Sequence, residues 1–292
     1  MNFKNYMELY DEGKKRLIKA LIHEYEIDAR YILLHIFGID MSDMLRDYTV
    51  QFSEQQKEKC IDYLAAIDVR ATHVPLQYIT QQQNFYGIDF YVDRNVLIPR
   101  QDTEILVEKV LKDNPPVTNG DKDSRRILDL CTGSGCIAVS LKKIGKYKEA
   151  FASDISADAL MLADKNALNN GIEMLFYQSD MFSQLDQVKE IDILTCNPPY
   201  IRSSVVDQLM PEVKDHEPRI ALDGMSDGLK FYRIIATEAQ KHLNNGARVY
   251  LEIGFDQADD VKKLLLSSGF DNIEITKDLA GLDRVVSASW NY

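Results

Sequence analysis

The N-terminal part of the chain repeats apolar residues at three- and four-residue spacing. The repeat runs through residues 12–23, 27–37 and 53–69. This spacing places the apolar side chains on one face of a helix. Ser53, followed three residues later by Gln56, is typical of a capping box at a helix start. The pattern therefore predicts a small helical domain over residues 1–74.

The pattern changes at Pro75. Residues 85–92 alternate apolar and polar side chains and are rich in aromatic residues, which is typical of a short strand pair. A helical pattern follows near residues 103–112. We therefore expect a linker with a β-hairpin over residues 75–98 and a second domain over residues 99–292.

From Arg126 onward, short apolar runs alternate with helical patterns. The runs predict strands over residues 127–130, 150–155, 174–180, 191–196, 247–254, 272–277 and 284–289. Strands that alternate with helices form a parallel sheet covered on both faces. Because no helix separates the last two strands, we expect them to pair antiparallel. The predicted fold class is α/β, a Rossmann-like sheet of about seven strands with a small helical N-terminal domain.

The net charge of −12 argues against a protein that holds nucleic acid by charge alone. The basic clusters Lys14-Lys15-Arg16 and Lys142-Lys143 lie beside acidic residues in helical patterns, which favours solvated helix faces. We therefore expect a protein or small-molecule substrate and no direct contact with nucleic acid. A local basic patch in a net-negative chain stays compatible with this composition.

No segment has the run of about 18 apolar residues that a membrane span needs. The first residues lack the basic-then-apolar order of a signal peptide. The four cysteines form no C-x-x-C pair, and no histidine spacing completes a zinc site. We expect a soluble, cytoplasmic monomer without a metal.

A glycine-rich turn follows the first strand of the sheet. In the segment DLCTGSGCIA (129–138), Gly133 and Gly135 let the backbone approach a ligand at the start of a helix. Asp154 ends the next predicted strand, where a carboxylate suits a ribose diol. These features predict a nucleoside-bearing cofactor. A nicotinamide dinucleotide and S-adenosylmethionine both fit this motif, and a tight turn with an unrelated aspartate is the simpler alternative.

The sequence Asn197-Pro198-Pro199-Tyr200 directly follows the fourth predicted strand. The Asn197 side-chain oxygen and the Pro198 carbonyl can accept the two N–H groups of a planar amide, and Tyr200 offers a ring to cover its face. The two prolines restrict the turn that carries these acceptors. This arrangement predicts methyl transfer to an amide or ring amine. The alternative is a loop that merely contains a helix-breaking Pro-Pro pair, and a dehydrogenase has no use for the arrangement.

Together with these motifs, most of the chain from about Pro75 to Ser289 resembles the HemK/PrmC family, the N5-glutamine methyltransferases of peptide chain release factors. The resemblance rests on PLQYIT (75–80), VLIPRQDTE (96–104), DLCTGSGCIA, NPPY (197–200), HEPRIALDGMSDGLKFYR (216–233), LEIG (251–254) and DLAGLDRVV (278–286). NPPY alone is shared with amino-methyltransferases of DNA and RNA, whereas VLIPR and the terminal AG-x-DR discriminate.

The resemblance implies a class I methyltransferase fold, S-adenosylmethionine as cofactor and the glutamine of a release factor Gly-Gly-Gln motif as target. It implies that the target amide is held by Asn197, Pro198, Pro199 and Tyr200. It assigns the cofactor to Gly133, Gly135, Asp154, Asp180, Asn197 and Thr103, with Asp180 near the adenine and Glu104 on the substrate side. Glu217 and Arg219 lie in a matching segment without an assigned role.

Four positions depart from the family pattern, one of them Met225, which replaces a glycine after Gly224. Gln101 and Asp102 replace a Pro-Glu pair. Cys131 stands where the glycine loop usually begins with Gly, so we expect that this position does not need a glycine backbone angle. The similar family that methylates a glutamine of a large-subunit ribosomal protein shares NPPY, and Thr103-Glu104 favours the release factor family instead.

Overall fold

The computed structural model describes residues 3–117 and 123–292, which form two compact units. The first unit contains residues 3–81 together with residues 210–216, and the second contains the other described residues. Each unit has its own hydrophobic core.

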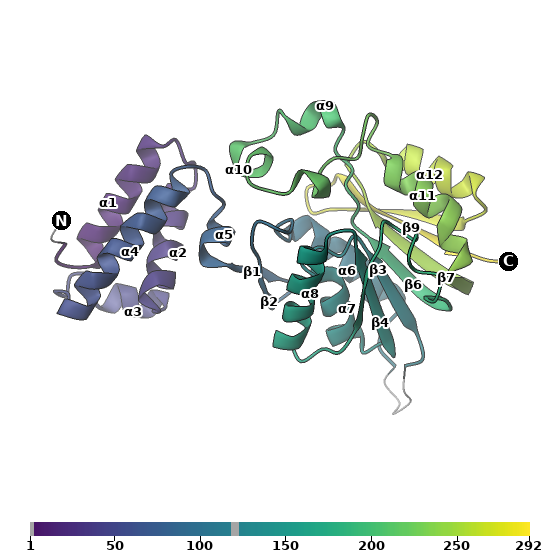
Figure 1. Cartoon of the computed structure of the whole chain (residues 1–292), viewed down its shortest axis with the longest axis horizontal. Helices are drawn as coiled ribbons and strands as arrows, with labels where there is room; N and C mark the ends of the chain where they lie inside the picture. Colours follow the sequence, from purple (N-terminus) through teal and green to yellow (C-terminus); the bar gives the residue numbers. More distant parts are fainter. Residues whose placement is uncertain (1–2, 118–122) are drawn as a thin grey trace. The chain divides into compact units, whose positions relative to one another are not determined.

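The first unit is helical (Figure 1). Its helices are α1 (Tyr6–Lys19), α2 (Tyr25–Phe37), α3 (Met41–Arg46), α4 (Glu54–Arg70) and α5 (Leu76–Thr80). The predicted capping box is confirmed, because the Ser53 hydroxyl accepts from the Gln56 N–H and the Gln56 side chain accepts from the Ser53 N–H. Tyr63 lies at the centre of the core, fully buried.

A later segment of the chain belongs to this first unit. Residues 210–216, which include the short helix α10 (Pro211–Lys214), return to it. Arg70 is buried and donates to Asp28 at 2.7 Å and to Glu212 at 3.2 Å. His73 lies 3.0 Å from the same Glu212 carboxylate. The pairs of Glu212 with Arg70 and His73 therefore join this segment to the helices.

The second unit begins with the hairpin β1 (Gln82–Phe85) and β2 (Ile88–Tyr91) and contains a seven-stranded sheet. The sheet strands are β3 (Arg126–Leu130), β4 (Glu149–Asp154), β5 (Leu175–Gln178), β6 (Ile191–Cys196), β7 (Leu243–Glu252), β8 (Asp271–Lys277) and β9 (Asp283–Trp290). Their order is β5-β4-β3-β6-β7-β9-β8. Strand β9 pairs antiparallel with both β7 and β8, and the other pairs are parallel. The predicted α/β fold is confirmed.

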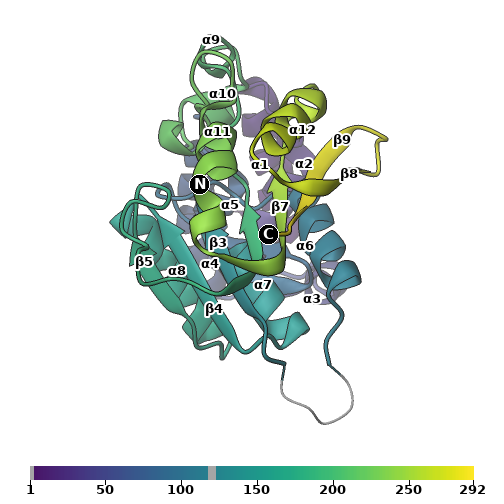
Figure 2. The same ribbon diagram turned by 90° about the vertical axis from the view of Figure 1, so that its right-hand side faces the viewer.

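Helices cover both faces of this sheet (Figure 2). On one face pack α6 (Gln101–Asp113), α7 (Cys136–Gly145) and α8 (Ala157–Asn169). On the other face pack α11 (Lys230–Glu238) and α12 (Ala258–Ser267). Along β3, Ile127 faces the first layer and Leu128 the second, because alternate side chains of a strand point to opposite faces.

The remaining elements of the second unit are the short helix α9 (Ser203–Val206) and single 3-10 turns at Arg219–Ala221 and Ala239–Lys241. Within residues 3–117 and 123–292, no helix combines the length and apolar character that crossing a membrane requires.

Candidate active site

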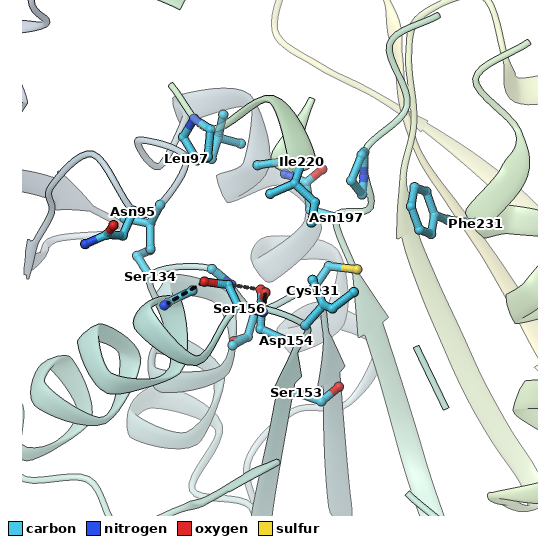
Figure 3. A pocket seen from close by; sticks show the side chains of 18 of the residues that line it. Asn95, Leu97, Cys131, Ser134, Ser153, Asp154, Ser156, Asn197, Ile220 and Phe231 are labelled. Carbon is cyan, nitrogen blue, oxygen red and sulfur yellow. Dashed lines mark hydrogen bonds between the residues drawn. The ribbon is translucent and has the colours of Figure 1, made fainter. Parts of the chain in front are cut away.

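A cavity of about 410 Å³ opens at the carboxyl ends of the parallel strands of the second unit. Residues far apart in the sequence meet on its wall, as Figure 3 shows for Asp154, Asn197 and Cys131. The predicted site residues that line it are Thr103, Gly133, Asp154, Asp180, Asn197 and Pro199. Parallel strands bring their carboxyl ends to one edge, where α/β sheets bind ligands. The volume lies in the range of small-molecule sites.

The glycine loop between β3 and α7 shapes the floor of the cavity. Gly133 has a φ of +53°, and a Cβ built there would meet nothing within 4 Å, so the loop presents open space. Gly135 caps α7 with a φ of +79°, and a Cβ there would lie 3.1 Å from the Cβ of Ala163. Gly135 therefore allows α7 and α8 to approach, whereas Gly133 faces the cavity.

Cys131 lines the cavity at the start of this loop. Its φ is +54°, in the left-handed region that favours glycine. The angle is nevertheless not restricted to glycine, because the cysteine adopts it. The Cys131 sulfur lies 3.7 Å from the sulfur of Met181, so its side chain packs at the cavity wall.

Asp129 lies fully buried beneath the loop. The hydroxyls of Thr132 and Thr195 each donate to one of its carboxylate oxygens at 2.7 Å. Burial raises the pKa of Asp129 to about 7, and the two hydroxyls act in the opposite direction. These bonds join the loop to the ends of β3 and β6. Asp129 belongs to the segment DLCTGSGCIA, but the sequence analysis assigned it no role. The spacing of residues in this segment does not indicate that its side chain is buried.

Asp154 ends β4 beside the loop. Its two carboxylate oxygens accept the backbone N–H groups of Gly133 and Ser156, each at 2.9 Å. Burial raises the pKa of Asp154, and these N–H groups counteract the rise. A carboxylate oxygen has more than one lone pair, so each can accept a further donor from a ligand. Asp154 thus both fixes the loop and faces the cavity.

Asn197 lies at the end of β6, half-buried on the cavity wall. Its Nδ2 donates to the hydroxyl oxygen of Thr103, on the first turn of α6, at 3.3 Å. Since the nitrogen is held by Thr103, the Oδ1 is the atom that Asn197 can offer as an acceptor. Pro198 and Pro199 are buried behind it, and Pro199 reaches the cavity.

Four predicted site residues lie outside the cavity lining. Pro198 and Gly135 pack behind it. The Tyr200 hydroxyl turns away and donates to Glu252 at 3.3 Å. Glu104 accepts the backbone N–H of Tyr86 at 2.8 Å, so it fixes the β1–β2 turn.

Other cavity-lining residues were missed by the sequence analysis. Leu97, Ile220 and Phe231 form apolar parts of the wall (Figure 3). Ile220 and Phe231 belong to the quoted segment 216–233, and Leu97 belongs to VLIPR, but motif letters carry no signal of which side chains face inward. An apolar wall suits an adenine ring or the alkyl part of a substrate.

The segment 216–233 also supplies ion pairs near the cavity. The Glu217 side chain is buried and accepts from Arg100, which lines the cavity. Burial raises the pKa of Glu217, and the Arg100 charge lowers it. Arg219 pairs with Asp207 at 2.6 Å and with Asp223 at 3.4 Å. These pairs connect two cavity-lining cations to neighbouring parts of the same unit.

Comparison with protein families gives two matches. Residues 8–80 match the PrmC N-terminal domain, and residues 101–213 match the methyltransferase small domain. The first match lies on the helices of the first unit, and the second includes the glycine loop and Asn197.

Curated relatives match nearly the whole chain. The chain is 40% identical to the release factor glutamine methyltransferase of Thermodesulfovibrio yellowstonii, over 92% of this chain and 95% of that protein. It is 38% identical to the protein of the same name from Clostridium acetobutylicum, over 90% of this chain and 91% of that protein. Among solved structures, a methyltransferase from Pyrococcus furiosus is 15% identical with a TM-score of 0.52, covering 79% of this chain and 99% of that chain. This last likeness concerns the fold alone.

Proposed function

Because the chain belongs to the family of release factor glutamine methyltransferases, we propose that it methylates the side-chain amide nitrogen of the glutamine in the Gly-Gly-Gln motif of peptide chain release factors. The observation that carries this proposal is the orientation of Asn197. Its Nδ2 is held by Thr103, so its Oδ1 is available to accept an N–H of the target amide.

The methyl donor is S-adenosylmethionine, which supplies an electrophilic methyl group on a sulfonium sulfur when bound. The described residues fit such a cofactor. The backbone at Gly133 leaves open space, and Asp154 provides a carboxylate for the ribose hydroxyls. Asp180 follows β5 on the cavity wall, where it can contact the adenine.

The chemical task of the chain's own residues is to orient a poor nucleophile. The lone pair of an amide nitrogen is delocalised, so the reaction depends on alignment with the methyl carbon. The Asn197 Oδ1 on the cavity wall is the proposed acceptor for one N–H group of the target, and the backbone carbonyl of Pro198, directly behind the lining, is the proposed acceptor for the other. The same acceptors stabilise the positive charge that develops on nitrogen as the bond forms. The methylated nitrogen then loses its proton readily, so the site needs no dedicated base.

We infer further that the helical unit binds the release factor away from its reactive glutamine and that the protein acts as a monomer. A single glutamine presents little surface, so selection of one protein needs contacts elsewhere. A release factor substrate implies action in the cytoplasm, where ribosomes terminate translation. The net charge of −12 supports a protein rather than a nucleic acid as the substrate.

The direct test offers the protein labelled S-adenosylmethionine and a panel of substrates: a release factor, a large-subunit ribosomal protein, DNA and RNA. We expect label on the release factor only. A release factor whose Gly-Gly-Gln glutamine is replaced by alanine is the matched control and should stay unlabelled. Label on the ribosomal protein or on nucleic acid would replace this proposal with one of the two alternatives.

A further inference from the structure

Residues from three separate segments of the sequence meet behind Asn197. Thr103 comes from VLIPRQDTE, Glu252 from LEIG and Arg284 from DLAGLDRVV. Glu252 is the last residue of β7 and pairs with Val285 of β9, which brings the neighbouring Arg284 to the same end of the sheet. All of these residues belong to the second unit.

Glu252 is a buried carboxyl group at the centre of this meeting point. Its Oε1 accepts from the Tyr200 hydroxyl at 3.3 Å. Its Oε2 is buried and has no hydrogen-bond partner among the described residues. A buried carboxyl oxygen without a partner is costly, and such groups persist where they serve a purpose. We therefore consider which neighbouring groups the Glu252 carboxylate can orient.

The groups that face Glu252 carry both charges and hydroxyls. Burial raises the pKa of Glu252 to about 7. The Thr103 hydroxyl, the Arg284 charge and the Tyr200 hydroxyl lower it, in that order, and Asp102 raises it. Asp102 itself pairs with Arg284 at 3.2 Å, which gives the departure at position 102 a contact.

The direction of the hydrogen bonds connects Glu252 to Asn197. The Thr103 oxygen accepts from Asn197, which leaves the Thr103 hydroxyl proton free. Because this hydroxyl lowers the pKa of Glu252, we infer that it points toward the unpartnered oxygen of the ionised carboxylate. An ionised carboxylate can only accept hydrogen bonds. It therefore requires Thr103 to donate to Glu252 and Asn197 to donate to Thr103. With that direction fixed, the Asn197 amide cannot turn over and present its N–H groups to the N–H groups of the target.

We propose that Glu252 is a positioning residue, which as a carboxylate fixes the orientation of Asn197 through Thr103 and the position of the Tyr200 ring through its hydroxyl. The inference deepens the proposed function and rests on it for its kinetic consequence. Protonation of Glu252 turns one of its oxygens into a hydrogen-bond donor. The Thr103 hydroxyl then no longer has to donate to Glu252, so the orientation of Asn197 is no longer fixed. Turnover should therefore rise with pH through about 7 and then level off.

The test compares two glutamate-to-glutamine variants of the full chain. In Glu252→Gln we expect kcat to fall by on the order of 100-fold, while the cofactor Kd from calorimetry and the KM for the release factor change little. The rise of kcat through neutral pH should disappear. Glu238→Gln, at an exposed ion pair with Lys241 on the far end of α11, makes the same chemical change and should leave kcat and its pH profile as in the wild type.

Variants of Thr103 separate positioning from packing. Thr103→Val keeps the shape without the hydroxyl and should lose kcat as Glu252→Gln does, and the double variant should lose little more. Thr103→Ser restores the hydroxyl and should recover most of the turnover. Wild-type kcat with an unchanged pH profile in Glu252→Gln, or additive losses in the double variant, would overturn the inference.

A measurement without substrate keeps this inference distinct from the proposed function. The side-chain amide protons of Asn197, observed by NMR, should shift between about pH 6 and about pH 8 in the wild type, because Glu252 titrates in this interval. They should not shift in Glu252→Gln. Identical behaviour of the two proteins would reject the connection, whichever substrate the wild type methylates.

Discussion

Two polar side chains on the cavity wall have separate partners and separate tasks. Asp154 accepts backbone N–H groups of the glycine loop, whereas Asn197 donates to Thr103 on α6. The first set of bonds concerns the surface that we propose for the cofactor, and the second concerns the acceptor that we propose for the target amide. Substitutions at the two positions should therefore affect different measurable quantities.

Asp154→Ala should weaken the binding of S-adenosylmethionine by about 1.5–3 kcal/mol, the scale of hydrogen bonds to a charged group. The loss includes the loop N–H groups of Gly133 and Ser156, which would lack their acceptor. Asp154→Asn keeps one acceptor oxygen and should lose less. Isothermal titration calorimetry measures both values, and an unchanged affinity in the alanine variant would remove Asp154 from the cofactor site.

Asn197→Ala should lower turnover by on the order of 100-fold or more, the effect of removing one preorganised polar group. Cofactor affinity should stay close to the wild-type value, because the Asn197 side chain is held by Thr103 and is proposed to face the target amide. Single-turnover kinetics with saturating cofactor measure the effect. Wild-type turnover with normal substrate binding would contradict the assigned role.

At this scale the sequence predicted the residues that follow strands and missed those that reach the cavity from other segments. Gly133, Asp154 and Asn197 could be found because strand ends share one edge of a parallel sheet. Phe231 and Ile220 could not, because their positions depend on how the segment after NPPY packs.

Among the elements, the glycine loop depends on a buried acid. Asp129 joins the loop to β6 through Thr132 and Thr195, and its pKa in the folded protein is about 7. In the unfolded chain an aspartate has a pKa of about 3.9. Between these values the folded protein binds the proton that the unfolded chain releases, so this group lowers the free energy of unfolding as pH rises.

Asp129→Asn should remove this pH dependence. The free energy of unfolding of the wild type should fall relative to the variant by about 1.4 kcal/mol for each pH unit between about pH 5 and about pH 7. Urea unfolding at several pH values measures the difference, and the subtraction cancels acids elsewhere whose pKa is lowered. A difference that is constant with pH would show that Asp129 stays ionised in the folded protein.

The elements themselves were predicted where the pattern is long enough. The strand over residues 191–196 has the predicted bounds. Helices α3, α5, α9 and α10 were missed because four to six residues hold too little of a helical repeat to detect. Strand β7 begins at Leu243 rather than at residue 247, because Leu243 pairs with Ile191 of β6 before an irregularity in the register.

For the whole molecule, the first unit offers a test of substrate recognition. We expect a chain lacking residues 1–74 to bind S-adenosylmethionine and to methylate a short Gly-Gly-Gln peptide about as poorly as the full protein does. Activity on the intact release factor should drop far more, because contacts remote from the glutamine would be lost. Steady-state kinetics on both substrates measure the contrast.

The deletion needs one control that the structure makes plain. It removes Arg70 and His73 and leaves Glu212 of the segment 210–216 without the two side chains that pair with it. The variant Glu212→Gln in the shortened chain removes the unpaired charge, and it should bind cofactor like its parent. Equal losses on peptide and protein, together with lost cofactor binding, would mean that the first unit serves only folding.

The return of residues 210–216 to the first unit has a thermodynamic consequence. One peptide bond separates His216, in the first unit, from Glu217, in the second, and Pro218 through Ala221 then line the cavity. If a partner on the helices changes the affinity of the cavity for its cofactor by some factor, the cofactor must change the affinity for that partner by the same factor. The total free energy of binding is then the same whichever ligand binds first. Cofactor and protein substrate share one coupling free energy.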